Sequence, residues 1–155
     1  MNKRLIRWLL GFAIIMLSVY IIFFEVQTYL GEQALEATGL DRVEFTRALE
    51  LAKEKNKFIL ADMSAIWCPS CRKLDKQVFS NQSVKKVIED NYIFTRLEYE
   101  SKQGKAFMEK YDIKGFPTIL ILDGDGNKQF VLPPTYDADL FIDYLNDFLE
   151  LQTAS

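Results

Sequence analysis

The sequence predicts an α/β domain preceded by one membrane-spanning helix. Three observations carry this prediction. The first 24 residues hold one long apolar run behind three basic residues. Two short strand patterns, FILADM (58–63) and TILIL (118–122), stand among segments whose apolar residues recur at helical spacing. The chain's two cysteines form a Cys-x-x-Cys shortly after the first of these strands.

The N-terminal apolar run is long enough to cross a bilayer. Trp8 to Phe24 are 17 residues without a charge, and reaching back to Leu5 gives 20 residues interrupted by Arg7 alone. Twenty helical residues span roughly 30 Å, the thickness of a hydrocarbon core. A cleaved signal peptide is the alternative, although the run is long for that role and no small-residue cleavage site follows it. We expect an uncleaved single-pass anchor.

Charge around the run predicts its orientation. Lys3, Arg4 and Arg7 precede it, whereas residues 25–41 carry acids and neither Lys nor Arg. The positive-inside rule then keeps the N-terminus cytoplasmic and exports the rest. We expect a protein of the inner (cytoplasmic) membrane whose domain is periplasmic or otherwise extracytoplasmic, and a cleaved signal would give the same compartment. We therefore expect the chain to consist of a basic end and anchor (1–24), a weakly structured tether (25–40) and a domain (41–155).

The remaining pattern predicts the order αβα(α)βαββα. Pro69 suits the first turn of a helix, serines cap the next one and Asp137 caps the last. DGDGN (123–127) is read as a hairpin turn, because Lys128 and Pro134 stand where a calcium loop needs glycine and glutamate. The predicted helices are 43–57, 68–79, 80–90, 101–113 and 138–151, and the strands are 58–63, 92–99, 118–122 and 128–132.

Composition excludes several classes of function. The net charge is −3 and no basic stripe follows residue 7, so we expect no nucleic-acid partner. The chain has no histidine, which removes a His general base and an imidazole ligand. Two cysteines alone cannot close a structural zinc site within one chain, although two chains sharing a zinc would still be compatible. We expect neither a metal nor another cofactor.

The Cys-x-x-Cys favours thiol–disulfide exchange. Cys68 begins a helix, whose exposed N–H groups favour a thiolate there, and Cys71 lies one turn further. A structural disulfide is the alternative, but closing so short a loop would stabilise the fold little. Asp62 lies inside an apolar strand, so its pKa should be raised and it can accept the proton of Cys71. A hydrogen-bonded structural acid is the other reading of Asp62.

ILADMSAIWCPSC (59–71), followed by GFPT (115–118), resembles the thioredoxin family. That resemblance implies a central mixed sheet flanked by helices and a redox-active Cys68–Cys71 disulfide. Trp67 matches the residue before the first cysteine, Asp62 the family's buried acid, and Pro117 its cis-proline. A cis bond before Pro117 would free the Phe116 backbone to pair with an extended substrate. Trp67, Phe116 and Pro117 are therefore expected to bind substrate.

Residues 41–150 are also similar to the C-terminal periplasmic domain of DsbD-type thiol:disulfide interchange reductases. Asp75 falls where that domain carries a second acid near the cysteines, and Arg96 where thioredoxins keep a lysine near the buried acid. The resemblance implies that both tune the pKa values of the site. A solvated charge on a helix face is the alternative for Asp75.

The expected function is a membrane-anchored protein-disulfide reductase. Cys68 would be the nucleophile, Cys71 the resolving thiol and Asp62 the proton acceptor. Its partners would be proteins with disulfides and a membrane electron donor of the DsbD or CcdA type. An oxidase or isomerase would use the same residues with a different redox poise. A tethered module that binds client thiols without turnover is a further alternative.

Overall fold

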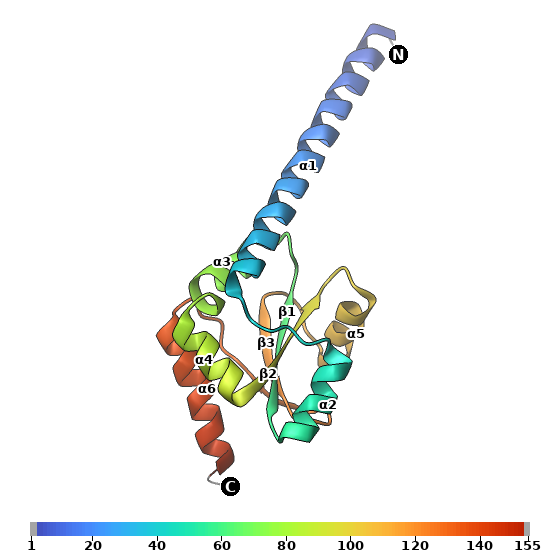
Figure 1. Cartoon of the computed structure of the whole chain (residues 1–155). Coiled ribbons are helices and arrows are strands. Elements are labelled where there is room, and N and C mark those ends of the chain that lie inside the picture. Colours follow the sequence, from blue (N-terminus) through green and yellow to red (C-terminus); the bar gives the residue numbers. More distant parts are fainter. Residues whose placement is uncertain (1–2, 154–155) are drawn as a thin grey trace.

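The computed structural model describes residues 3–153 and has a mixed four-stranded sheet at its centre (Figure 1). The strands lie in the order β2-β1-β3-β4, with β1 parallel to β2 and antiparallel to β3, and β4 antiparallel to β3. This confirms the predicted α/β class with its mixed sheet. The strands are β1 (Phe58–Ser64), β2 (Tyr92–Glu98), β3 (Thr118–Leu122) and β4 (Lys128–Val131).

Helices cover both faces of the sheet, because β1 is buried on both. Along this strand Leu60 points to one core and Ile59, Ala61 and Met63 to the other. The first core is closed by α3, η1, α4 and α6, and the second by α2 and α5. The helices are α1 (Lys3–Thr38), α2 (Phe45–Lys55), α3 (Pro69–Leu74), the π-helix η1 (Asp75–Phe79), α4 (Gln82–Asn91), α5 (Lys102–Tyr111) and α6 (Ala138–Thr153).

Local hydrogen bonds explain most of the element boundaries. The carboxylate of Asp137 accepts from the N–H groups of Asp139 and Leu140 and caps α6, as predicted. The carboxylate of Asp123 accepts from the N–H groups of Asp125 and Asn127 and closes the hairpin turn before β4.

Two local expectations were wrong. Asn81, rather than a serine, caps α4, since its side chain accepts from the N–H groups of Ser83 and Val84. The single helix predicted over 68–79 is divided at Asp75, where the backbone widens into a π turn. There the N–H and the hydroxyl of Ser80 both bond to the carbonyl of Asp75, at 2.9 and 2.7 Å.

The segment predicted as a weakly structured tether, residues 25–40, was also misjudged. Helix α1 continues without a break to Thr38, and its last turns pack against α3 and η1. The physical reason is a buried face at helical spacing, formed by the small or polar residues Gly31, Ala34 and Thr38 together with Leu35. The division into an anchor of residues 1–24 and a domain of residues 41–155 stays a prediction.

The N-terminal part of α1 projects away from the domain (Figure 1). Among residues 3–153, α1 is the one helix that is long and apolar enough to cross a membrane, a property that it shares with signal sequences. Large apolar side chains cover its free part, with Trp8 81% and Phe12 64% exposed. Such a surface favours a non-aqueous environment around this part of α1.

Candidate functional site

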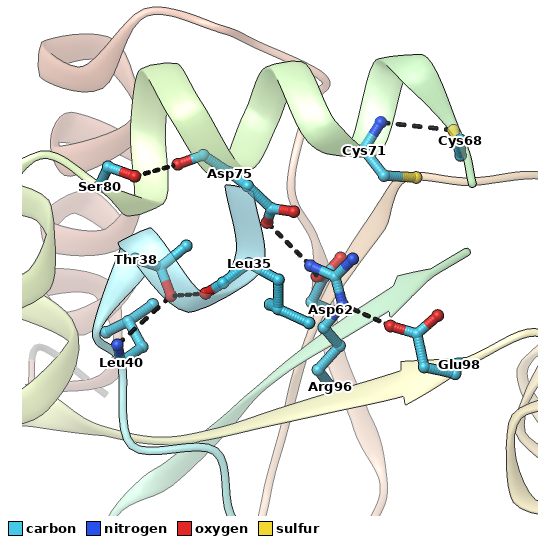
Figure 2. Close-up of polar contacts among 10 residues, drawn as sticks. All are labelled: Leu35, Thr38, Leu40, Asp62, Cys68, Cys71, Asp75, Ser80, Arg96 and Glu98. Carbon is cyan, nitrogen blue, oxygen red and sulfur yellow. Dashed lines mark hydrogen bonds and ion pairs between the residues drawn. The ribbon is translucent and has the colours of Figure 1, made fainter. Parts of the chain in front are cut away.

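The two cysteines lie at the start of α3, just beyond the end of β1. Cys68 is the N-cap residue and Pro69 occupies the first helical turn, where its missing N–H is not needed. The Sγ of Cys68 accepts a hydrogen bond from the backbone N–H of Cys71 at 3.3 Å (Figure 2). Both thiols are free, and both residues are buried, with 6% and 1% exposed. The Sγ of Cys68 thus lies at the N-terminal end of α3, where a backbone N–H points at it.

Cys71 holds its proton more tightly than an ordinary thiol. Burial raises the pKa of Cys71, and its hydrogen bond with Cys68 acts in the same direction. The Ser64 hydroxyl and the backbone at Ala65 act in the opposite direction, and the charge of Asp62 raises the pKa further. Cys71 therefore needs a base before it can act as a nucleophile, and Asp62 is electrostatically coupled to it.

Asp62 is a buried acid in the middle of the sheet. Its pKa is raised to about 7, mainly by burial; the charge of Arg96 opposes this change, and the charges of Asp75 and Glu98 add to it. Its Oδ2 lies 3.1 Å from Nη1 of Arg96, while Oδ1 has no hydrogen-bond partner among the described residues. Oδ1 is thus the oxygen free to carry a proton, and a carboxyl with this pKa gains and loses that proton near neutral pH.

Arg96 is the centre of a buried charge cluster (Figure 2). Parallel pairing of β1 with β2 sets it directly beside Asp62. Its Nη1 lies 2.8 Å from Oδ1 of Asp75, and its Nε lies 2.7 Å from Oε1 of Glu98. Burial opposes the charge of Arg96, yet the three carboxylates outweigh it and raise its pKa. One cation therefore faces three acids, an excess of negative charge that favours a proton on one of them.

Asp75 belongs to this cluster and not to a solvated helix face. Its side chain is 1% exposed and points from the start of η1 back towards Arg96. Burial raises the pKa of Asp75, and Arg96 opposes that change. The structure thus brings Asp62, Asp75 and Arg96 together, while their part in tuning the thiols stays a proposal.

One side of the site is rimmed by aromatic rings. The Phe116–Pro117 peptide bond is cis and leads into β3. The ring of Phe116 packs edge-on against Trp67, with centroids 5.6 Å apart, and lies 5.3 Å from Tyr99. Trp67 and Phe116 in turn pack on the two buried cysteines. Two of the three residues expected to bind substrate, Trp67 and Phe116, therefore lie against the thiols, and Pro117 directly follows Phe116.

Sequence reasoning missed Glu98, Tyr99 and Phe24 at this site. Glu98 follows Arg96 by two residues on a strand, a spacing that sets both on the same face and could have identified it. Tyr99 and Phe24 carry no such signal, because only the fold brings their rings to Phe116 and Trp67. Within residues 3–153, no group of three or more His, Cys, Asp or Glu side chains is arranged to hold a metal ion.

Comparison with known proteins finds relatives over the domain. The chain is 29% identical over 112 residues to the UBX domain-containing protein 7 homolog of Dictyostelium discoideum, a match that covers 72% of this chain and 22% of that protein. It is 30% identical over 100 residues to the thiol:disulfide interchange protein DsbD of Escherichia coli K12, covering 63% of this chain and 18% of DsbD. The chain thus spans about a fifth of the length of these relatives.

Solved structures share the fold. The DsbH oxidoreductase matches with a TM-score of 0.65 at 18% identity, over 72% of this chain and 85% of that one. The C-terminal domain of Neisseria meningitidis DsbD, in its oxidised form, matches with a TM-score of 0.55 at 20% identity, over 66% and 90% of the two chains. The model of the thioredoxin-like domain family matches residues 45–149. The chain therefore belongs to the thioredoxin-like domain family, and DsbD is among its relatives.

Proposed function

We propose that this protein is a membrane-anchored, extracytoplasmic thiol:disulfide oxidoreductase that reduces protein disulfides. The observation that carries the proposal is the free Cys68–Cys71 pair at a helix start, coupled to a buried acid whose pKa is about 7. The relationship to a protein named for thiol:disulfide interchange supports the same chemistry. No further group is needed for it, because the two thiols supply both electrons.

The reaction proceeds in two exchanges. The Cys68 thiolate attacks one sulfur of the substrate disulfide, forms a mixed disulfide and expels the other sulfur as a thiolate, which takes up a proton. Cys71 then loses its proton, attacks the Sγ of Cys68 and releases the second substrate sulfur. Two electrons have passed to the substrate, which leaves as a dithiol, and Cys68 and Cys71 remain joined as a disulfide.

Asp62 makes the second exchange feasible at neutral pH. Burial raises the pKa of Cys71, so its thiolate is scarce without a base. Asp62 is coupled to that thiol and exchanges a proton near pH 7. We assign it the role of proton acceptor for Cys71, with Arg96 limiting how far its pKa rises.

The charges on either side of the apolar part of α1 support the membrane anchor and its orientation. Arg4 and Arg7 precede the apolar part of α1, while Glu25, Glu32 and Glu36 follow it, which supports a cytoplasmic N-terminus in the inner membrane and an exported domain. Each turnover oxidises the Cys68–Cys71 pair, so another dithiol must reduce it again. A membrane protein of the DsbD or CcdA type is the donor that fits this position.

The test is reduction of insulin by the full-length, pre-reduced protein in detergent. Wild type should reduce insulin, and Cys68→Ser should abolish the reaction. Cys71→Ser should accumulate a mixed disulfide at Cys68, detected as a mass increase that dithiothreitol reverses. Lys76→Ser, an exposed change on η1, is the matched control and should react like wild type. A wild-type rate no higher than that of the double cysteine variant would support a module that binds thiols without turnover.

A further inference from the structure

Three successive turns of α1 contact α3 and the active-site loop, the residues 65–68 that join β1 to α3. The ring of Phe24 lies 6.1 Å from that of Trp67, the residue before Cys68. The side-chain oxygen of Gln27 accepts a hydrogen bond from Arg72 at 2.8 Å. A Cβ at Gly31 would lie 1.8 Å from the carbonyl oxygen of Ile66, so only glycine permits this approach. The helix that leaves the membrane therefore rests directly on the redox site.

The end of α1 is equally fixed. Ala34, Leu35 and Thr38 are buried against the domain, and Leu40 belongs to its core. The Thr38 hydroxyl donates to the carbonyl of Leu35 at 2.7 Å and accepts from the N–H of Leu40 at 3.3 Å (Figure 2). The apolar part and the docked part belong to one unbroken helix from Lys3 to Thr38.

This docking sets the height of the site above the bilayer. Phe24 is the last residue of the uncharged run, and the carboxylate of Glu25 places the edge of the hydrocarbon core there. At 1.5 Å per residue, Phe24 and Gly31 are separated by about 10 Å along the axis, and the active-site loop lies between these levels. A headgroup layer is about 5–8 Å thick, so the loop beside Cys68 lies in or just above it.

The surface around the thiols fits a protein partner better than lipid. Trp67 and Tyr99 are residue types typical of the membrane interface. The adjoining groove between α1 and the active-site loop, however, is lined by four acids and two arginines, one of which is the ion-paired Arg96. A net negative groove repels lipid phosphates and attracts basic side chains. The acids are Glu32, Glu44, Glu98 and Glu100.

We propose, resting on the proposed function, that the client whose disulfide Cys68 reduces is an integral membrane protein with its cysteines at the bilayer surface on the same side. The docked α1 holds the thiols at that height, beside the aromatic rings of Trp67, Phe116 and Tyr99. Disulfides held well above the bilayer surface encounter Cys68 rarely and are reduced more slowly. The anchor is thus a specificity element as well as a tether.

The test uses synthetic probes in phosphatidylcholine vesicles that also contain the pre-reduced full-length protein. Each probe is a single-span peptide whose cysteine carries a fluorescent dye through a disulfide. Reduction turns the mixed disulfide into peptide thiol and dye thiol, while Cys68 and Cys71 become a disulfide. In the surface probe the cysteine lies at the end of the span. In the raised probe an eighteen-residue helix, about 27 Å long, separates it from the span. The same dye on glutathione serves as a soluble probe.

Wild type should reduce the surface probe about tenfold faster than the raised probe, because only the former shares the height of the site. Inserting an eighteen-residue polar helix between Phe23 and Phe24 lifts the domain by about 27 Å. Eighteen residues make five full turns, so the orientation of the domain about the helix axis stays the same. This variant should prefer the raised probe. The same segment appended behind Thr153 should retain the wild-type preference, and all three proteins should reduce the soluble probe at equal rates.

The inference would be overturned by equal rates with both membrane probes, or by a preference that the insertion leaves unchanged. Normal reduction of the soluble probe would still uphold the proposed function in either case. Loss of reduction of every probe by wild type would overturn both. A preference that appears only when anionic phosphatidylglycerol is added would show that lipid, and not a membrane protein, engages this face, and would also overturn it.

Discussion

Replacing Asp62 by asparagine should stabilise the protein at alkaline pH and much less at acidic pH. Burial raises the pKa of Asp62 from 3.8 to about 7. In the unfolded chain the carboxyl ionises near its ordinary value, so between these two pH values the folded state holds a proton that the unfolded state has lost. The free energy of unfolding therefore falls as pH rises through this window, by about 1.4 kcal/mol per pH unit, and the full cost above pH 7 is about 4 kcal/mol.

Asparagine removes this cost, while Arg96 keeps Asp75 and Glu98 as partners. Urea unfolding of the full chain in detergent micelles, followed by tryptophan fluorescence, measures the difference. The variant should exceed wild type by about 1.5 kcal/mol at pH 5 and by about 4 kcal/mol at pH 8.5. Asp90→Asn, an exposed change on α4, is the control. An Asp62→Asn effect that is constant with pH, or destabilising throughout, would refute the assignment of a buried titrating acid.

Three further outcomes are expected. Asp62→Asn should slow release of the mixed disulfide about tenfold to a hundredfold near pH 7, because Cys71 loses its base, and rapid-quench trapping measures this step. Arg96→Gln should lower the free energy of unfolding by about 3–5 kcal/mol, since the buried Asp62 and Asp75 lose their cation. Arg96→Lys should lose less, and equal losses would contradict a charge role. Gly31→Leu should lower the thermal midpoint of the domain by several degrees, whereas Gly11→Leu, on the open part of α1, should leave it unchanged. Equal midpoints for these two leucine variants would mean that α1 is not docked.

Much of the fold could be read from the sequence, because its signals are local. FILADM and TILIL are short apolar runs bounded by turn residues, and the amphipathic segment over 43–57 gave helix α2 nearly to its ends. The segment after the membrane run was misjudged for a specific reason. Its buried face consists of small or polar residues such as Gly31, Ala34 and Thr38, which contribute little to hydrophobic periodicity.

The site was predictable in part. The two cysteines, Asp62 and Pro117 stand at motif positions and could be chosen from the sequence, whereas their chemical roles remain proposals. The environment of Asp75 was not predictable. Its burial depends on the packing of η1 over β2, and on Arg96 reaching it from a strand 21 residues away. Contacts between distant segments of this kind, including Phe24 against Trp67, exist only once the chain has folded.

The equilibrium redox potential of the Cys68–Cys71 pair distinguishes a protein that reduces disulfides from one that forms them. Burial raises the pKa of Cys71, so ionisation of this thiol adds no stability to the dithiol form, which favours passing its electrons on. A reductase should show a potential near that of thioredoxin, about −270 mV, measured on the full chain by equilibration with dithiothreitol. A potential near that of DsbA, about −120 mV, would contradict a reductase and assign the protein to disulfide formation.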